Sequence, residues 1–360
     1  MMKIAIDQRR SGIALIIVMI IVVVFAILAG GLAYSMKVET RLARNASWDT
    51  ELEWLGRSGI ELAKYVLSHP GQPGQQFDAL NQKWAGGTGE TNEAMASISL
   101  TDNQLGHGRF SVKIKDADSK FNINLAVLTP EIVNQGLILM GVDAAEAPHI
   151  VNAIIDWTDR DDDPRVGSTD TESEYYLSLN PPYRAKNGPI DDLTELMMIK
   201  GISPAMYYGS GGVAAAPGSV PVSTRFNKHT GEEPSYPIGF VDLFTTISGR
   251  FININTASAN VLQLIPDVDG ALAQAIITAR NGPDGVEGNE DDMPFRSVGE
   301  VANVPGMNRE LAQLFSRYFS TRSSTFEVQV ETEIDAVKRT YFAVLRRNGN
   351  QIFTLFMYWR

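Results

Sequence analysis

Ile13–Ala29 reads IALIIVMIIVVVFAILA, which is 17 residues without a polar side chain. The next four residues, Gly30–Ala33, extend the apolar run to 21. A helix of this length is about 31 Å long, which matches the hydrocarbon core of a bilayer. The stretch therefore predicts a transmembrane helix, which we place at residues 13–36.

The residues before this helix are basic. Lys3, Arg9 and Arg10 outweigh Asp7, so that residues 1–12 carry a net charge of +2. Positive charge beside a membrane span holds that end in the cytoplasm. The rest of the chain is predicted to lie across the membrane. Because the whole chain has a net charge of −11 and residues 1–12 have +2, residues 13–360 have a net charge of −13.

The junction between the leader and the helix points to a particular kind of processing. The apolar run is longer than the roughly 7–15 residues of a secretory signal peptide. Arg9-Arg10-Ser11-Gly12 directly precedes Ile13, and this boundary resembles a type IV prepilin signal. The resemblance implies that a prepilin peptidase cuts after Gly12 and that the new N-terminus, Ile13, is methylated. A plain membrane anchor and a cleaved signal peptide remain the alternatives.

One residue departs from the usual pilin pattern. Most pilin-like subunits have Glu at the fifth position of the mature chain, where this sequence has Ile17. In a filament that Glu is thought to neutralise the N-terminal amine of a neighbour inside an apolar bundle, where an unpaired charge is costly. A subunit without it suits the tip of a filament, where no subunit lies above.

Composition excludes several classes of protein. With 360 residues the chain should hold two or three domains, and its 44% hydrophobic content supports a packed core. It has no cysteine, which excludes disulfides, zinc–thiolate sites and thiol catalysis. Its net charge of −11 disfavours a surface for nucleic acid.

Periodicity predicts a helix at residues 37–69 that continues the transmembrane helix as one rod. Alternation predicts strands on both sides of a large helical middle, with a hairpin turn at Asn348-Gly349. The predicted strands are Ser97–Leu100, Phe110–Lys115, Thr325–Ile334, Lys338–Arg347 and Gln351–Trp359.

The helical middle contains an internal repeat. Phe121–Asn124 (FNIN) recurs as Ile252–Asn255 (ININ), and Asp192–Ile202 matches Ser297–Met307. Each copy is interpreted as helix, acidic loop, helix, short Gly hairpin and helix, with a Gly-, Pro- and Ser-rich linker at about 209–239 between them.

These copies resemble helix-hairpin-helix modules, which usually bind DNA phosphates through main-chain N–H groups. The charge of these modules disfavours DNA binding, because residues 121–210 carry a net charge of −9 and residues 251–319 a net charge of −5. We therefore expect modules that pack on partner proteins, and no nucleic acid.

The combination of leader, Asn-x-Asn repeat and two helical modules resembles the minor pseudopilin K family of type II secretion systems. The likeness covers nearly the whole chain. The matching segments are Trp54–Ala63, Asp118–Asn124, Ile155–Asp159, Tyr175-Tyr176, Pro181–Tyr183 and Asn187.

This resemblance implies an α+β fold. A pilin-like head would combine the long N-terminal transmembrane helix with an antiparallel sheet, and a large all-α domain with two helix-hairpin-helix-like repeats would be inserted into it. The expected division is leader 1–12, transmembrane helix 13–36, pilin-like helix and first strands 37–120, inserted domain 121–320 and C-terminal strands 321–360.

The implied function is that of a minor pseudopilin at the tip of the pseudopilus, which starts and caps its assembly for export of folded proteins across the outer membrane. The implied partners are minor pseudopilins I and J, the major pseudopilin, the prepilin peptidase and inner-membrane lipid. The head would be periplasmic, on a single-pass anchor in the inner membrane.

Two alternatives come from other classes: a periplasmic binding protein or enzyme anchored to the inner membrane, and a competence-type DNA-binding protein. We expect no enzyme, since the chain has no GxSxG elbow, no GxxxxGK loop and no Cys.

The densest carboxylate cluster follows Asp156. Asp159, Asp161 and Asp163 alternate along a loop, and such crowded carboxylates repel one another unless a cation lies between them. Ca²⁺ takes about 6–8 oxygen ligands in flexible geometry. Asp170 is the twelfth residue counted from Asp159, but Pro164 stands where an EF-hand needs Gly.

We therefore predict a structural Ca²⁺ site outside the EF-hand class. The K family binds calcium in this insertion, and its acidic position before the Tyr pair matches Glu172. The predicted ligands are Asp159, Asp161, Asp163, Asp170 and Glu172. A solvated acidic loop is the alternative, and whether the second acidic loop, residues 284–292, binds metal stays open.

Overall fold

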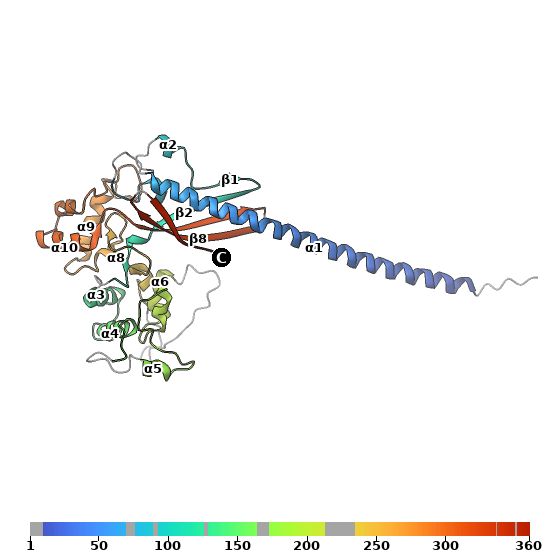
Figure 1. Cartoon of the computed structure of the whole chain (residues 1–360), viewed down its shortest axis with the longest axis horizontal. Helices are drawn as coiled ribbons and strands as arrows, with labels where there is room; N and C mark the ends of the chain where they lie inside the picture. The colour runs from blue at the N-terminus through green and yellow to red at the C-terminus, as the bar shows by residue number, and fades with distance from the viewer. Residues whose placement is uncertain are drawn as a thin grey trace, which may run out of the picture.

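The computed structural model describes residues 10–69, 76–88, 93–125, 129–163, 173–212, 235–335, 337–349 and 351–360. Its first element, helix α1 (Arg10–Ser68), is one unbroken helix of 59 residues. The first half of α1 projects away from the rest of the chain, and the second half lies on the head (Figure 1). The predicted transmembrane stretch and the predicted helix at 37–69 are thus one rod.

An antiparallel sheet of five strands forms one part of the head, in the order β1-β2-β7-β8-β9. The strands are β1 (Asn103–Leu105), β2 (Gly108–Asp116), β7 (Thr325–Ile334), β8 (Val337–Asn348) and β9 (Gln351–Trp359). Alternation of apolar and polar residues places Phe110, Val112 and Ile114 in the core. Gly349, with φ of 62°, makes the predicted turn between β8 and β9.

Four of the five predicted strands are therefore present, but the prediction of a strand at Ser97–Leu100 is wrong. These residues follow helix α2 (Glu93–Ala96) as a turn and a bend, and the first strand comes later, at β1. The apolar alternation here reports burial of Leu100 in the core rather than pairing of the backbone in a ladder.

The second half of α1 packs on one face of the sheet. Leu52, Leu55, Ile60 and Ala63 are buried there among side chains of β2, β7 and β8. Gly56 lies against the ring of Tyr341, where an added Cβ would come within 2.5 Å of the ring. Glycine thus lets the helix approach the sheet closely.

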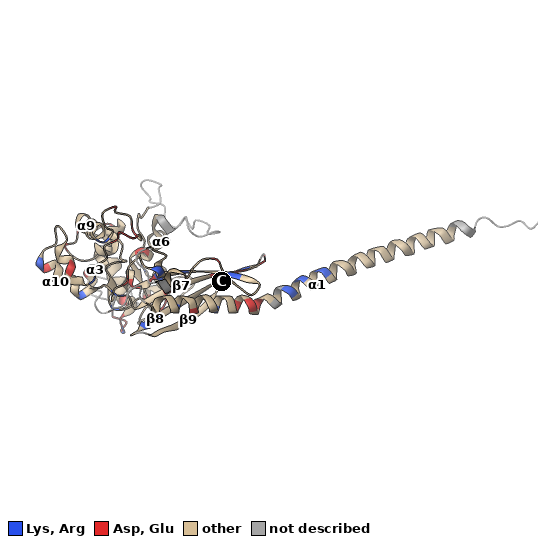
Figure 2. Cartoon of the chain, turned by 90° about the horizontal axis from the view of Figure 1, so that it is seen from above, with Lys and Arg blue, Asp and Glu red and all other residues tan. Residues whose placement is uncertain are grey.

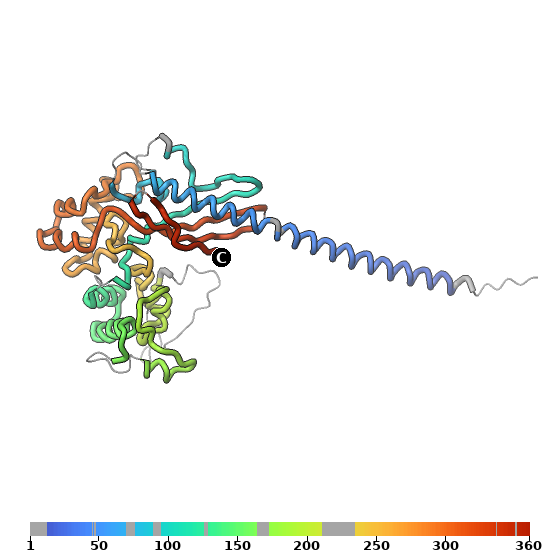
Figure 3. Tube along the Cα trace, viewed as in Figure 1, coloured from blue at the N-terminus to red at the C-terminus, as the bar shows by residue number. Residues whose placement is uncertain are grey.

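The chain between β2 and β7 forms a second part with its own core. In Figure 3 this part lies at the end of the sheet away from the projecting half of α1. Its helices are α3 (Pro130–Met140), α4 (Ala147–Thr158), α5 (Ser173–Leu177), α6 (Pro204–Gly212), α7 (Phe240–Leu243), α8 (Ala259–Leu262), α9 (Gly270–Arg280) and α10 (Arg309–Tyr318). The 3₁₀ helices are η1 (Lys83–Ala85), which packs with the sheet part, and η2 (Ala117–Ser119), η3 (Leu193–Met198) and η4 (Val298–Asn303).

Two short parallel ladders occur in this part. Strand β3 (Phe121–Asn122) pairs with β4 (Phe244–Thr245), and β5 (Ile252–Asn253) pairs with β6 (Phe319–Ser320). Each ladder therefore joins the first strand of one sequence copy to a strand that follows the helices of that copy.

The repeated Asn-x-Asn residues make the same contacts in both copies. Asn124 exchanges two hydrogen bonds with the main chain of Ile190 (2.8 and 2.8 Å), and Asn255 does the same with Phe295 (2.9 and 2.9 Å). Each contact fixes the segment that leads into η3 or η4. Since Asn offers both a donor and an acceptor, one side chain can satisfy both main-chain groups.

The matching segments Asp192–Ile202 and Ser297–Met307 also fold alike. In each, a 3₁₀ helix is followed by a Gly with positive φ: Gly201 at 90° and Gly306 at 89°. The element before the Gly turn was predicted as a helix, and it is a 3₁₀ helix of six residues in both copies.

Candidate functional site

The projecting half of α1 is apolar and exposed. Its residues from Ile13 on form a helix long and apolar enough to cross a membrane, by length and composition. From Ile13 the first charged residue in the sequence is Lys37, and Figure 2 shows the long uncharged stretch of α1 before the first blue residues. Gly12 lies inside α1, and Ile13 is 63% exposed. Processing after Gly12 stays a prediction.

The first acidic loop begins at the end of α4. Asp159 is the C-cap residue of α4, and its N–H donates to the carbonyl of Ile155. Asp161 and Asp163 are exposed, and an Oδ1 atom of Asp161 accepts from the N–H of Asp163 (3.2 Å). Asp170 and Glu172 lie outside the described residues. In the part of the chain that the structure describes, no three His, Asp or Glu side chains are close enough to hold a metal ion.

Asn187 belongs to this loop, although it follows Asp163 by 24 residues and we did not predict it as a ligand. Its Nδ2 donates to the carbonyl of Asp161 (3.0 Å) and to Oδ1 of Asp162 (3.1 Å). Hydrogen bonds from Asn187 and Ser173 lower the pKa of Asp162. The buried Oδ1 of Asn187 has no hydrogen-bond partner among the described residues. An oxygen of this kind suits a hard cation.

The second acidic loop is held by its own hydrogen bonds. Asp284 accepts from the N–H of Val286 (2.7 Å) and from Nδ2 of Asn289 (2.7 Å). Arg280, which is 5% exposed, pairs with Glu287 at 2.7 Å. Arg280 offsets only part of the carboxylate charge, and the buried Oδ1 atoms of Asn289 and Asp292 have no hydrogen-bond partner among the described residues. Whether this loop binds a metal stays open.

In the Gly turns after η3 and η4, the amide of the residue that follows the Gly is bonded within the fold. The N–H of Ile202 donates to the carbonyl of Ile199 (3.2 Å), and the N–H of Met307 donates to that of Val304 (3.0 Å). Both amides are therefore used within the fold.

Three buried carboxylates lie where the chain passes between the two parts of the head. Asp78, Asp116 and Asp118 are 5%, 8% and 1% exposed. Among the residues that the structure describes, Asp78 alone of the three forms an ion pair, with Arg347 at 2.5 Å. Asp116 and Asp118 are neighbours in the sequence, and Asp118 begins one of the segments that match the family, but Asp78 and Arg347 come from distant parts of the chain, so spacing did not predict the cluster.

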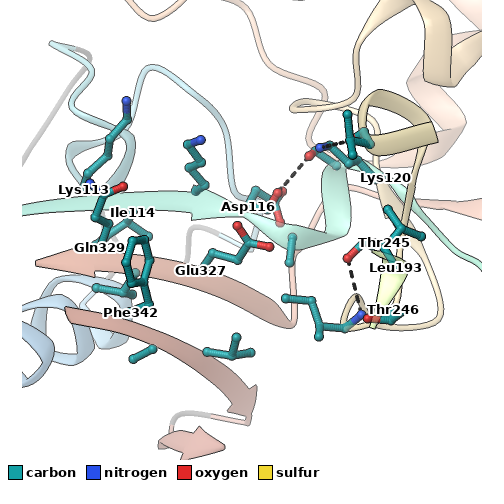
Figure 4. Close-up of a pocket in the computed structure, with 18 of the residues that line it drawn as sticks. Lys113, Ile114, Asp116, Lys120, Leu193, Thr245, Thr246, Glu327, Gln329 and Phe342 are labelled. Atoms are coloured by element: carbon teal, nitrogen blue, oxygen red, sulfur yellow. Dashed lines mark hydrogen bonds between the residues drawn. The ribbon is translucent and has the colours of Figure 1, made fainter. Parts of the chain in front are cut away.

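A cleft of about 800 Å³ opens beside these carboxylates. One wall is the sheet face opposite α1, with Lys113, Glu327 and Phe342, and the other wall includes Leu193 and Thr245–Ile247. Figure 4 shows Asp116 in this cleft, between the two walls. The cleft holds charges of both signs, including Lys113, Lys115 and Glu327.

The family models and the relatives found by comparison with known proteins agree on one family. Two models described as type II secretion system (T2SS), protein K match residues 119–209 and 252–322. Type II secretion system protein K from Pseudomonas aeruginosa is 26% identical over 79% of this chain and 76% of its own length. The protein of the same name from Aeromonas hydrophila is 26% identical over 56% of this chain, and the match spans 61% of that relative.

A solved structure has the same fold. The K subunit in the crystal structure of the GspK-GspI-GspJ complex from the enterotoxigenic Escherichia coli type 2 secretion system aligns with a TM-score of 0.61 and 17% identity. The alignment covers 88% of this chain and 99% of that one, so it includes both the sheet and the helical part. Together with the family models and the relatives, this places the chain in the protein K family of type II secretion systems.

Proposed function

We propose that this minor pseudopilin starts and caps the pseudopilus of a type II secretion system, in support of the export of folded proteins across the outer membrane. The observation that carries the proposal is the combination of a long apolar helix with a head of two separate cores. Pilin-like subunits assemble through such an apolar helix. The second core makes the head bulky.

Bulk and charge both favour the tip. Repeated subunits rise along a filament by a small step, so a head with about 200 extra residues would collide with heads above and beside it. Ile17 in the apolar helix offers no carboxylate to a neighbour's N-terminal amine. Both features are tolerated where no subunit lies above.

Two further minor pseudopilins, I and J, are the proposed direct partners, as in the complex that contains the structural neighbour. The exposed face of α1 supports this, because Trp54 and Tyr65 are 63% and 44% exposed on the part of the helix that lies on the head. The major pseudopilin would follow below the trio. Cross-links placed along α1 should trap the chain with I and J rather than with itself. Recovery along the shaft in numbers like the major subunit would exclude the tip.

The helix also sets the proposed topology and processing. A basic leader before α1 places the N-terminus in the cytoplasm and the head in the periplasm, and the boundary at Gly12-Ile13 suits the prepilin peptidase. Mass spectrometry of the membrane-extracted protein should show loss of residues 1–12 and a methylated Ile13. A mature chain that begins near residue 34 would contradict this.

We interpret residues 121–320 as an insertion into a pilin-like head, built from two related helical units. The pairing of β2 with β7 across this segment, and the matched contacts of Asn124 and Asn255, support that division. No step of a reaction is assigned to the chain.

A structural Ca²⁺ ion is proposed for the first acidic loop, with Asp159, Asp161, Asp163, Asp170 and Glu172 as ligands. The oxygen of Asn187 supports it, because this atom is buried beside the loop and lacks a partner among the described residues. When bound, the ion would neutralise charge that otherwise holds the loop open, and so would act on folding.

A further inference from the structure

We propose that Asp78, Asp116 and Asp118 form a proton-dependent latch, which holds the sheet part and the helical part of the head together more tightly when Asp116 is protonated. The latch is defined as these three residues with their partners Asn253, Thr256, Ser323, Ser324, Gly249 and Arg347. It is separate from the acidic loops and from the membrane helix.

The latch lies where the chain crosses between the two parts. The first crossing leaves β2 at Asp116 and reaches β3 at Phe121, and the second leaves β6 at Ser320 and reaches β7 at Thr325. Asp118 ties the two crossings together, since it accepts from the N–H and the Oγ of Ser324 (2.6 and 2.8 Å). It also accepts from the N–H of Gly249 in the helical part (2.6 Å).

Asp116 makes a second set of links. Its Oδ2 accepts from Oγ of Ser323 (2.6 Å), Oγ1 of Thr256 (2.5 Å) and, at 3.3 Å, Nδ2 of Asn253. Its Oδ1 accepts from the N–H of Asp118 (2.8 Å). A carboxyl at the end of a sheet strand is thus bonded to Asn253 in β5, to Thr256 just after β5 and to the second crossing.

The charges in this cluster do not balance. Arg347 pairs with Asp78 and donates to the carbonyl of Ser323 (3.0 Å), which leaves Asp116 and Asp118 without a basic partner in the cluster. Other charged groups line the cleft. There Lys115 is opposite Glu327 in the strand register, and Nζ of Lys120 donates to the carbonyl of Val241 (2.5 Å), with Asp242 nearby.

Like charges in a buried site favour protonation of one of them. Burial, together with the charge of Asp118, raises the pKa of Asp116 to about 7. Burial also raises the pKa of Asp118, against the hydrogen bonds from Gly249 and Ser324 that lower it. Asp116 therefore holds its proton over a range in which an exposed Asp has lost it.

The hydrogen bonds can accommodate this proton. The hydroxyl of Thr256, which donates to Asp116, is also 3.3 Å from the carbonyl of Asn253. When Asp116 is protonated, its O–H can donate to Oγ1 of Thr256, whose own hydrogen turns to Asn253. No partner has to leave, so the closed latch persists in both states and differs between them in stability.

The sign follows from the raised pKa. The stabilising contribution of Asp116 is fully present below the pKa of an exposed Asp, about 4, and is lost as the pH rises through about 7. Opening of the latch releases one proton in this window. Its equilibrium constant should then rise by up to about tenfold for each pH unit, and level off above pH 7.

Hydrogen exchange of the full chain in detergent micelles tests the latch, from about pH 5 to about pH 8, after correction for the intrinsic pH dependence of exchange. The amides of Gly249, Ser323 and Ser324 report opening. Asp116→Asn should remove the pH slope. The matched control is Asp267→Asn, at an exposed position in the helical part, and it should keep the slope.

Two results would overturn the proposal. The first is an opening equilibrium constant that stays the same in the unaltered chain between about pH 5 and pH 7. This measurement does not depend on whether a variant folds. The other is a slope that survives in Asp116→Asn, because the titrating group would then lie elsewhere.

Discussion

Single Asn residues hold the helical part together at two equivalent places. Asn255 is 2% exposed, and it satisfies both the N–H and the carbonyl of Phe295. Asn124 does the same for Ile190 at the other copy. No other small side chain offers a donor and an acceptor in this planar arrangement, which explains why both copies carry the same residue.

Asn255→Ala should lower the free energy of unfolding by about 2–3 kcal/mol, because it leaves two buried main-chain groups of Phe295 without partners. Urea denaturation followed by circular dichroism measures the change. Gln274→Ala, at an exposed position of α9, is the control and should change stability by less than about 0.5 kcal/mol. Equal effects of the two variants would show that the Asn255 contact contributes nothing.

The acidic loop gives a second prediction for single residues. Ca²⁺ at 100 times its Kd should stabilise the chain by about 2.7 kcal/mol if it binds the native state alone. Asp159→Ala combined with Asp161→Ala should abolish this increase, and Asp284→Ala in the second acidic loop should not. A melting temperature that is the same in Ca²⁺ and in chelator would refute the site.

Helix α1 shows how one element can serve two environments. Its first half is apolar on all sides, and its second half buries one face on the sheet. Gly56 and Gly59 lie on that face, against Tyr341 and Val330, whereas Gly30 has no heavy atom within 4 Å of an added Cβ. Glycine therefore has a packing role at the first two positions and none within the head at the third.

Gly56→Ala should destabilise the head by about 1–2 kcal/mol. Ala is favoured over Gly by about 1 kcal/mol in a helix, but overlap with the buried ring of Tyr341 costs up to about 3 kcal/mol. Tryptophan fluorescence during denaturation reports the change. Gly30→Ala is the control: it raises helix propensity by the same amount without overlap, and it should leave the unfolding of the head unaltered. If Gly56→Ala stabilised the head, the helix would not lie as close to Tyr341 as the structure shows.

At the scale of the whole molecule, a polar connection joins the two cores. One core joins α1 to the sheet, the other fills the helical part, and both crossings pass the latch. Arg347 is central to this connection. Besides Asp78, it donates to the carbonyl of Leu67 at the end of α1 (3.0 Å) and to that of Ser323 (3.0 Å).

Arg347→Met should lower the stability of the molecule by about 3–5 kcal/mol, because it leaves Asp78 buried without its partner. The two parts should then melt at separate temperatures in calorimetry. Arg57→Met removes an exposed pair with Glu53, which should matter by less than about 1 kcal/mol. A single transition at the original temperature in Arg347→Met would contradict this account of the connection.

Local pattern was enough to predict the long helix, four of the strands and the turn at Asn348-Gly349. It failed at Ser97–Leu100, where apolar alternation reflects burial without a ladder. It predicted a helix before each Gly turn, where the structure has the 3₁₀ helices η3 and η4, because the spacing of apolar residues does not separate the two helix types. Among the candidate ligands, spacing located Asp159, Asp161 and Asp163 in one loop, but Asn187 enters that loop from a distant segment.

The amino-acid sequence by itself determined the apolar membrane helix, the charge on either side of it and the repeat of the Asn-x-Asn segments, because each is a property of neighbouring residues. Only the tertiary structure decided which carboxylates are buried together. Asp78, Asp116 and Ser323 are brought into contact by the pairing of β2 with β7 and by the docking of the helical part. Burial and the charge of neighbours set their protonation, and both depend on contacts between residues far apart in the chain.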